Sequence, residues 1–309
     1  MIAGHVEWPR DRPVWKFDFR LSENPDSEGI AFTNVFFKNH LVLFKASLPM
    51  IRVHYDPLPF WFFYGINNPN FQVDGRFVTA IYKDSLSANN AYLFAGLNLL
   101  VHVRASEGVT REGVRFVAVE SAHTIGAYRL TNRWIFQEDG IIAPQLWSAG
   151  LRHPANHRHH VYWRFDFDID GARHNVALSR YDWWPSEWGW GPGWRPIANE
   201  RSFTRPSCSK IAIHNTRTRR GYHVVPGPFD GQADGFSTFD FTLLRYHADE
   251  DRHGLLGSPI SDQLGQHFNN ESTEEKDIVL WYCAHLSHEV SDDGDEWHVC
   301  GPILFPIGF

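Results

Sequence analysis

Alternating apolar and polar residues run through much of the chain. The segment 14–21 alternates with a period of two, and the segment 162–169 does the same. Such alternation is typical of a β-strand with one face on the core and the other in solvent. Further strand-like runs lie at 31–36, 41–45, 50–55, 76–82, 115–120, 133–136, 175–180, 210–214, 222–225, 236–245, 278–283 and 302–305.

Turn signals separate these runs, and helical periodicity is weak. Asp-Gly or Pro-Gly pairs stand at 74–75, 139–140, 170–171, 226–227 and 293–294. The best helix candidate is 87–99, and the Trp-, Gly- and Pro-rich segment 182–197 predicts an irregular loop. Many short strands with little helix predict an all-β chain, either a large β-sandwich or a barrel. Because no linker or repeat is visible, we predict one domain over residues 1–309.

Composition and charge exclude several classes of partner. The 309 residues include 29 Lys and Arg against 36 Asp and Glu, a net charge of −7, so no nucleic-acid partner is expected. No apolar run approaches the ~18 residues of a membrane span, so no membrane partner is expected. The amino-terminal residues do not resemble a signal peptide, so we expect a cytoplasmic protein. Its three cysteines are expected to be free thiols, with a Cys283–Cys300 bridge as the alternative.

The histidines are the strongest sign of chemistry, since the chain has 18 of them. His157 and His159 form an H-x-H motif directly before an alternating strand. Residues i and i+2 of a strand share a face, so the two imidazoles lie roughly 6–7 Å apart and can bind one ion. Neutral imidazole suits copper, zinc, iron or nickel. The alternative is a polar strand edge, and His160 would point to the opposite face.

The H-x-H motif begins a longer string that resembles the copper-ligand strand of the copper amine oxidases. The string continues through Arg164, Asp166, Asp168 and Asp170-Gly171. Five more blocks follow the order of that family: 15–17 with 34–35, 45–48 and 55–57; 124–128 with Trp134 and 139–140; 221–227; 277–282 with His288; and 296–299. The resemblance covers nearly the whole chain, but only the catalytic domain of the family. It implies a large β-sandwich, the family's supersandwich, without the two small amino-terminal domains.

The resemblance also implies roles for single residues. His157, His159 and His298 would bind copper, with His285 and His288 as alternatives for the third ligand, although His288 better matches a non-ligand histidine of the family. Tyr128 stands where the family has the tyrosine that becomes topaquinone, which makes it the implied catalytic and cofactor residue.

A second metal site and a pocket residue complete these expectations. Asp166, the backbone of Phe167 and Asp168 match a calcium segment, with Asp292 or Asp293 as partners. Hard carboxylate and carbonyl oxygens suit calcium, and the alternative is a solvated strand face. His123 is expected in the core or in a pocket near Tyr128.

Departures from the family pattern shape the functional prediction. The cofactor motif N-Y-D/E is replaced by 127–129, Ala-Tyr-Arg, and the region of the catalytic base, 64–69, lacks the expected Asp. Because α-proton abstraction from an amine adduct needs a base, we expect little oxidation of ordinary primary amines. We predict a copper-dependent oxidoreductase acting on a small molecule. The alternatives are a repurposed enzyme of specialised metabolism with a non-amine reaction and a noncatalytic binding protein. A homodimer is compatible with the fold, although the family's dimer arm is shortened.

Overall fold

The computed structural model describes most of the chain, in thirteen segments. They are residues 2–21, 30–55, 71–74, 77–81, 103–125, 128–150, 156–181, 193–205, 207–235, 237–251, 264–289, 291–292 and 296–309. The helix predicted at 87–99 and the expected base region at 64–69 lie outside these segments. So does 182–192 of the Trp-rich segment, while 193–197 forms a strand rather than the predicted loop.

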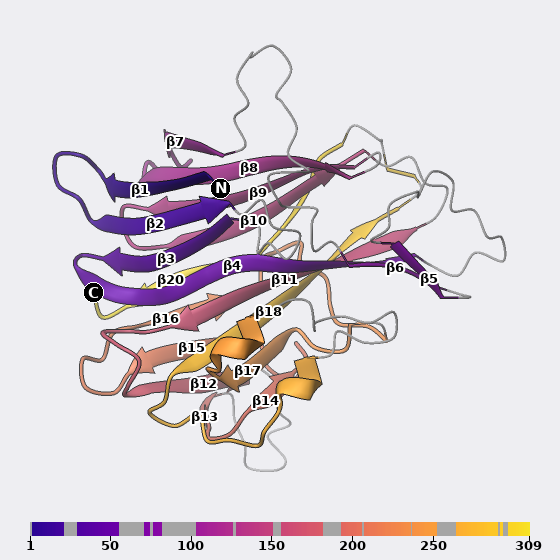
Figure 1. Cartoon of the computed structure of the whole chain (residues 1–309). Helices are drawn as coiled ribbons and strands as arrows, with labels where there is room; N and C mark the ends of the chain where they lie inside the picture. The colour runs from indigo at the N-terminus through magenta and orange to yellow at the C-terminus, as the bar shows by residue number, and fades with distance from the viewer. Residues whose placement is uncertain are drawn as a thin grey trace.

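Two large antiparallel sheets face each other and make up the described chain, which confirms the all-β sandwich (Figure 1). The first sheet has the order β1-β2-β3-β4-β11-β18-β17-β14, with β6 on β4 and β5 on β6. Its strands are β1 (Ile2–Trp8), β2 (Trp15–Leu21), β3 (Ile30–Phe37), β4 (His40–Tyr55), β5 (Phe71–Asp74), β6 (Phe77–Ile81), β11 (His157–Phe167), β14 (Arg201–Phe203), β17 (Phe241–Arg245) and β18 (Ile278–His288).

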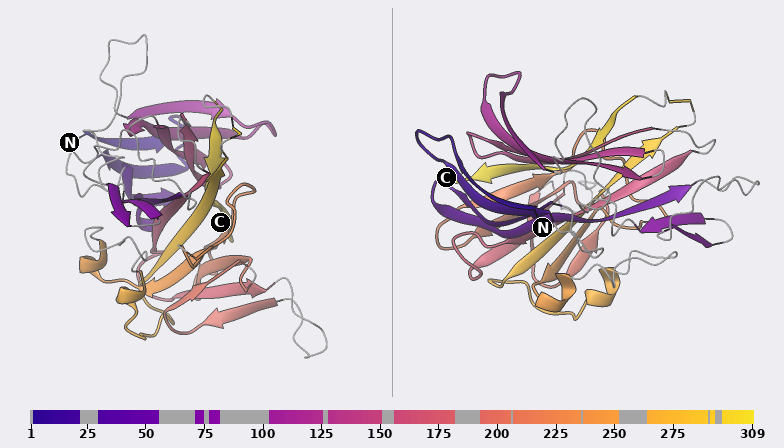
Figure 2. Two further views of the ribbon diagram at one scale, coloured as in Figure 1. Left: turned by 90° about the vertical axis from the view of Figure 1, so that its right-hand side faces the viewer. Right: turned by 45° about the horizontal axis from the view of Figure 1, so that its top comes forward.

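The second sheet has the order β13-β12-β15-β16-β20-β10-β9-β8-β7, with β19 also paired to β10. Its strands are β7 (Arg104–Val109), β8 (Arg115–Ile125), β9 (Tyr128–Gln137), β10 (Ile142–Ala149), β12 (Asn175–Tyr181), β13 (Gly193–Ile197), β15 (Lys210–Asn215), β16 (Gly221–Val225), β19 (His298–Cys300) and β20 (Ile303–Ile307). Two 3-10 turns, η3 (Ala248–Asp251) and η5 (Leu264–His267), lie on the outside of the first sheet (Figure 2).

Strand β4 shows how the chain joins two predicted strands into one. The runs 41–45 and 50–55 belong to a single strand of 16 residues. The pairing of β4 with β11 shifts register between Ser47 and Met50, so a bulge contains Pro49. A bulge accommodates the missing N–H of proline within a central strand. The β3–β4 hairpin turns through Lys38 and Asn39, both with positive φ, as a two-residue loop requires.

The central pair β11 and β18 differs from the prediction of half-buried strands. Ten of the eleven residues of each strand are buried, because the second sheet covers one face and the η5 segment packs on part of the other. Arg164 and Asp166, expected in solvent, are only 3% and 1% exposed. The alternation in β11 therefore separates two buried faces, one apolar and one that carries polar groups. By contrast, β2 shows the predicted pattern, with Trp15 and Phe17 buried and Arg20 exposed.

Aromatic side chains from both sheets fill the space between them. Phe32 of the first sheet packs against Trp134 of the second at 4.9 Å, and Trp134 meets Phe165 of β11 at 6.0 Å between ring centroids. A smaller cluster on the other face of β11 and β18 joins Tyr162 and Trp281 to Leu264 of η5. Burying each such side chain stabilises the fold by roughly 1.5–3 kcal/mol, so both faces of β11 and β18 are held in place.

Three smaller features complete the description of the fold. Cys208, Cys283 and Cys300 are all buried and none forms a disulfide, so the alternative Cys283–Cys300 bridge is not formed. The basic residues of 217–220 lie in and just after a turn between β15 and β16, where Arg220 bonds Asp170. Within the described segments, no helix has the length and apolar character needed to cross a membrane.

Candidate metal centre

Strand pairing brings histidines from distant parts of the sequence to one end of β11. His157 and His159 begin this strand, and His157 lies directly opposite His288, the last residue of β18. His298 begins β19 in the other sheet, opposite Ser148 of β10. The four residues His157, His159, His288 and His298, called here the histidine cluster, therefore lie between the two sheets.

The distances within the histidine cluster fit a single metal ion. Ring centroids of His157, His159 and His288 are mutually 4.8–5.2 Å apart, and His298 joins through His288 at 4.6 Å. Imidazoles bound to one ion at ~2.0–2.1 Å place their ring centroids about 4.5–5.2 Å apart. The rings of His157, His159 and His288 match this separation. The ligand atoms that lie within 4.8 Å of one another are those of His288, His298 and Asp292.

Burial keeps His159 and His288 uncharged, which is the form that binds metal. His157, His159 and His288 are at most 1% exposed. Burial, followed by the neighbouring imidazoles, holds the pKa of His159 well below its usual value. The same causes lower the pKa of His288 to about 3. Neither ring nitrogen of His288 has a hydrogen-bond partner among the described residues. Such buried lone pairs are costly unless a cation satisfies them.

The structure bears on which histidine would join His157 and His159 as the third metal ligand. His298 is the most exposed member of the cluster. Its Nε2 is 3.5 Å from the carboxylate of Asp292, and both side chains are about one-fifth exposed. His288 is instead fully buried between the other rings. His285, the other alternative, lies on the opposite face of β18 because it is an odd number of residues from His288. Ligand atoms of His288 and His298 lie in one group with a carboxylate oxygen of Asp292, so the predicted His298 and its alternative His288 both lie where a third ligand could stand.

Tyr128 and His123 are described through their backbones alone. Tyr128 begins β9 opposite Ile125, and β9 is separated from β19 only by β10. The next residue, Arg129, places its guanidinium 5.5 Å from the ring of Trp297, the neighbour of His298. The fold therefore brings the backbone of Tyr128 to the same end of the sandwich as the histidine cluster. His123 lies on β8, opposite Leu130.

A cavity adjoins the histidine cluster and offers a route to it. It has a volume of about 410 Å³ and is lined by His298 and residues on either side, including Glu296, Trp297 and Phe229. Phe229 and Trp297 are partly exposed, at 66% and 40%. Cavities with apolar walls and a few polar groups are typical of small-molecule sites. The cavity can therefore admit a small molecule to the edge of the cluster.

The opposite end of β11 carries a carboxylate cluster, which consists of Asp166, Asp168 and Asp277. Carboxylate oxygens of the three lie within 4.8 Å of one another. Burial and the charge of Asp277 raise the pKa of Asp168 to about 7, and burial raises the pKa of Asp277. One oxygen of Asp168 and one of Asp277 are buried without a hydrogen-bond partner in the described chain. A hard cation would relieve both the repulsion and the missing bonds.

The partner of Asp166 and Asp168 is thus a residue that sequence reasoning did not name. Asp277 directly precedes β18, and Phe167 pairs with Ile278, so Asp277 comes opposite Asp168. Asp292, expected there, instead lies beside His298, and Asp293 is outside the described residues. The matching D-x-V-x-W-Y block at 277–282 was the available signal, but only strand pairing shows that it meets the aspartates of β11.

Comparison with known proteins places this geometry on a known fold. No protein-family model and no curated protein matches the chain. Solved structures similar to it include a copper-containing benzylamine oxidase from Hansenula polymorpha, with a TM-score of 0.69 at 14% identity. The lysyl oxidase of Pichia pastoris and an amine oxidase of Aspergillus nidulans both give 0.66, at 14% and 16% identity.

The extent of these matches defines what they show. They cover 96% of this chain but only 59%, 52% and 51% of the three other chains, so the chain spans little more than half their length. At such low identity the similarity shows the fold alone. The chain has the β-sandwich of a copper amine oxidase-like catalytic domain, with a cluster of buried histidines between its two sheets.

Proposed function

We propose that the chain is a copper-dependent oxidoreductase in which His157, His159 and His288 hold the ion. One observation carries the proposal: three buried imidazoles, none more than 1% exposed, have ring centroids 4.8–5.2 Å apart, the separation expected for imidazoles that bind one ion. Imidazole also suits zinc and nickel, and the copper amine oxidase-like fold favours copper. Bound copper would supply one-electron redox chemistry with dioxygen.

The protein's own residues suggest how a substrate would be bound and how protons would move. Phe229 and Trp297 offer apolar and aromatic surface in the cavity beside His298, which suits a small molecule with an apolar or aromatic part. The Asp292 carboxylate at 3.5 Å can hold the proton of His298 at Nε2. The other ring nitrogen would then act as base or acid toward the cavity, and Glu296 provides a second carboxylate there.

Oxidation of ordinary primary amines is proposed to be weak, and the reaction is proposed to have diverged. The methyl side chain of Ala127 cannot hydrogen-bond a quinone formed at Tyr128. Misplacement of a reacting group by ~1 Å can lower the reaction rate about 10²-fold. The absence of a general base typically lowers the rate by a further ~10²–10⁴-fold. These substitutions favour a second candidate, a repurposed oxidoreductase that acts on a different functional group at the same metal. Calcium at the carboxylate cluster is proposed as a structural ion.

The test is dioxygen consumption and hydrogen-peroxide release by the copper-loaded chain, with aromatic and aliphatic amines and alcohols as substrates. We expect copper-dependent consumption with a non-amine substrate and amine rates near background. A peptide mass map over Tyr128 after exposure to copper and oxygen reports whether the tyrosine is modified. Robust amine turnover that is lost in Tyr128→Phe would show a working amine oxidase. The absence of any copper-dependent consumption would favour the noncatalytic binding protein.

A further inference from the structure

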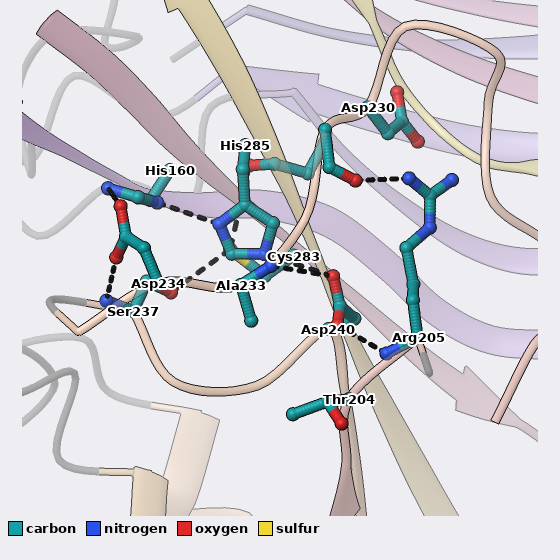
Figure 3. Close-up of polar contacts among 12 residues, drawn as sticks. His160, Thr204, Arg205, Asp230, Ala233, Asp234, Ser237, Asp240, Cys283 and His285 are labelled. Atoms are coloured by element: carbon teal, nitrogen blue, oxygen red, sulfur yellow. Dashed lines mark hydrogen bonds and ion pairs between the residues drawn. The ribbon is translucent and has the colours of Figure 1, made fainter. Parts of the chain in front are cut away.

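A second group of metal-ligating side chains lies on the opposite face of the same two strands. His160 of β11 pairs directly with His285 of β18, and Cys283 is two residues from His285 and so shares its face. All three are buried, with exposures of 0%, 1% and 3%. Figure 3 shows His160, His285 and Cys283 side by side, with aspartates around them. Because adjacent strand residues point apart, this group is separate from the histidine cluster.

The potential ligand atoms of the three residues lie close together. Nδ1 of His160 is 2.8 Å from Nδ1 of His285, and Sγ of Cys283 is 3.9 Å from the latter. One potential ligand atom from each residue lies within 4.8 Å of the other two. A tetrahedral zinc site, with bonds of ~2.0–2.1 Å to nitrogen and ~2.3 Å to sulfur, separates these atoms by roughly 3.3–3.7 Å. Opening the imidazole pair by about 0.5 Å would therefore accommodate the ion.

Two aspartates lie on the far side of the imidazoles. Nε2 of His285 is 3.3 Å from Oδ1 of Asp240, and Nε2 of His160 is 3.6 Å from Oδ2 of Asp234. Both carboxylates are fixed from behind: Asp240 accepts the backbone N–H of Arg205, and Asp234 accepts that of Ser237 (Figure 3). Carboxylates in this position are the usual outer partners of metal-bound histidines, since they keep the ring proton on the outer nitrogen.

That arrangement leaves the two inner nitrogens facing each other. The two Nδ1 atoms are hydrogen-bonded to each other at 2.8 Å, which requires a proton on one of them. A bound cation would replace that proton, and each Nε2 would then keep its proton toward an aspartate. A proton shared by the rings would satisfy them without using Cys283. A metal ion would satisfy both rings and the thiolate together.

We propose that His160, Cys283 and His285 bind a zinc-type divalent ion, at a site independent of the proposed copper function. One thiolate and two imidazoles suit zinc, a borderline-soft ion, and do not suit calcium or magnesium. The thiol proton leaves to solvent as the ion binds. The fourth position would be open to water. The ion would tie β11 to β18 and, through the aspartates, to the segment 230–240.

The test is a titration of the metal-free full-length chain with Co²⁺, which replaces zinc and reports thiolate ligation by a charge-transfer band in the near ultraviolet. We expect this band to saturate at one equivalent and to disappear when Zn²⁺ is added. It should vanish in Cys283→Ser and persist in Cys208→Ser, which removes a different buried free thiol. It should also persist in the double variant His157→Ala, His159→Ala, which separates this site from the copper site.

The outer aspartates give a graded test. Asp240→Asn should weaken Co²⁺ binding about 10–100-fold, as loss of an outer partner does at other metal sites. If Cys283→Ser does not fold, as judged by near-ultraviolet circular dichroism, the wild-type titration still decides the question. A wild-type chain without a thiolate band would overturn the proposal, and so would a band that survives in a folded Cys283→Ser variant.

Discussion

The two ends of β11 carry opposite kinds of ligand on the same pair of strands. The histidine cluster lies at the first end, where burial lowers the pKa of His288 to about 3. The carboxylate cluster lies at the other end, where burial raises the pKa of Asp168 to about 7. Burial disfavours the charged form in both cases. The result is a neutral, softer set of nitrogen ligands at one end and a hard oxygen set at the other.

This contrast teaches that the ligand type, and not the strand framework, selects the ion at each end. The nearest members of the two clusters on β11, His159 and Asp166, are seven positions apart, roughly 23 Å. Both ends use the same device, a cross-strand partner supplied by β18: His288 opposite His157, and Asp277 opposite Asp168. The following predictions separate the two ends, in order of decreasing effect.

Loss of the H-x-H pair should have the largest effect. In the double variant His157→Ala, His159→Ala we expect copper affinity to fall by more than about 100-fold. Loss of a residue that only hydrogen-bonds a metal ligand already lowers affinity by about 10–100-fold, and loss of two direct ligands should cost more. Equilibrium dialysis with metal analysis measures it. His5→Ala, which removes an exposed histidine bonded to Asp18, is the matched control and should bind copper normally. Unchanged affinity in the double variant would place the copper site elsewhere.

Calcium should bind at the carboxylate cluster and not at the histidine cluster. Ca²⁺ at pH 7 should raise the melting temperature of the wild-type chain, because binding to the folded state stabilises it. Asp168→Asn and Asp277→Asn should remove this increase, which differential scanning calorimetry measures. The histidine double variant should keep it. If Asp277→Asn responds to Ca²⁺ as the wild type does, Asp277 is not part of the site.

The pH dependence of stability should have opposite signs at the two ends of the metal-free chain. His288 accepts a proton near pH 6.5 when unfolded but only near pH 3 when folded, so its contribution rises with pH between these values. Asp168 loses its proton near pH 3.8 when unfolded but near pH 7 when folded, so its contribution falls as pH rises through this window. Each contributes at most about 1.4 kcal/mol per pH unit.

Urea unfolding between pH 4.5 and 6.5 tests whether His288 and Asp168 have these opposite effects on stability. Stability should rise less steeply with pH in His288→Phe than in the wild type, because the His288 contribution is lost and that of Asp168 remains. It should rise more steeply than in the wild type in Asp168→Asn. Identical pH slopes in the wild type and both variants would show that these two groups do not control the dependence.

The smallest expected effect is the coupling between the two ends. Sites separated by far more than 10 Å usually contribute additively, within about 0.3–0.5 kcal/mol. Saturating Ca²⁺ should therefore change copper affinity by no more than about twofold. Isothermal titration of copper with and without Ca²⁺ measures this. A tenfold change would mean that β11 and β18 transmit a conformational change between the clusters.

The sequence predicted the strands better than it predicted their surroundings. Alternation located β2 and β11, and the H-x-H motif located the first two histidines. The same alternation misplaced Arg164 in solvent, because periodicity does not show that a second layer covers the polar face. Sequence order also could not choose among the later histidines. His288 is distinguished by its register opposite His157, and register is set by tertiary pairing rather than by local pattern.

Sites formed across strands were the least predictable. The ligand groups at His160 and Asp168 each need a partner from β18, more than 100 residues away in sequence. Cys283 was considered for a disulfide because its spacing from Cys300 suggested a hairpin. Its actual neighbour is a histidine pair, which appears only when β11 and β18 are paired residue by residue.

The most direct test of the copper centre compares His288→Ala with His298→Ala. The measurement is copper stoichiometry and affinity, together with the nitrogen hyperfine splitting in the electron paramagnetic resonance spectrum of bound Cu²⁺. We predict one tightly bound copper in the wild type and in His298→Ala, with the splitting retained, and loss of tight copper in His288→Ala. Tight copper that survives in His288→Ala and disappears in His298→Ala would contradict the assignment of His288 as the third ligand.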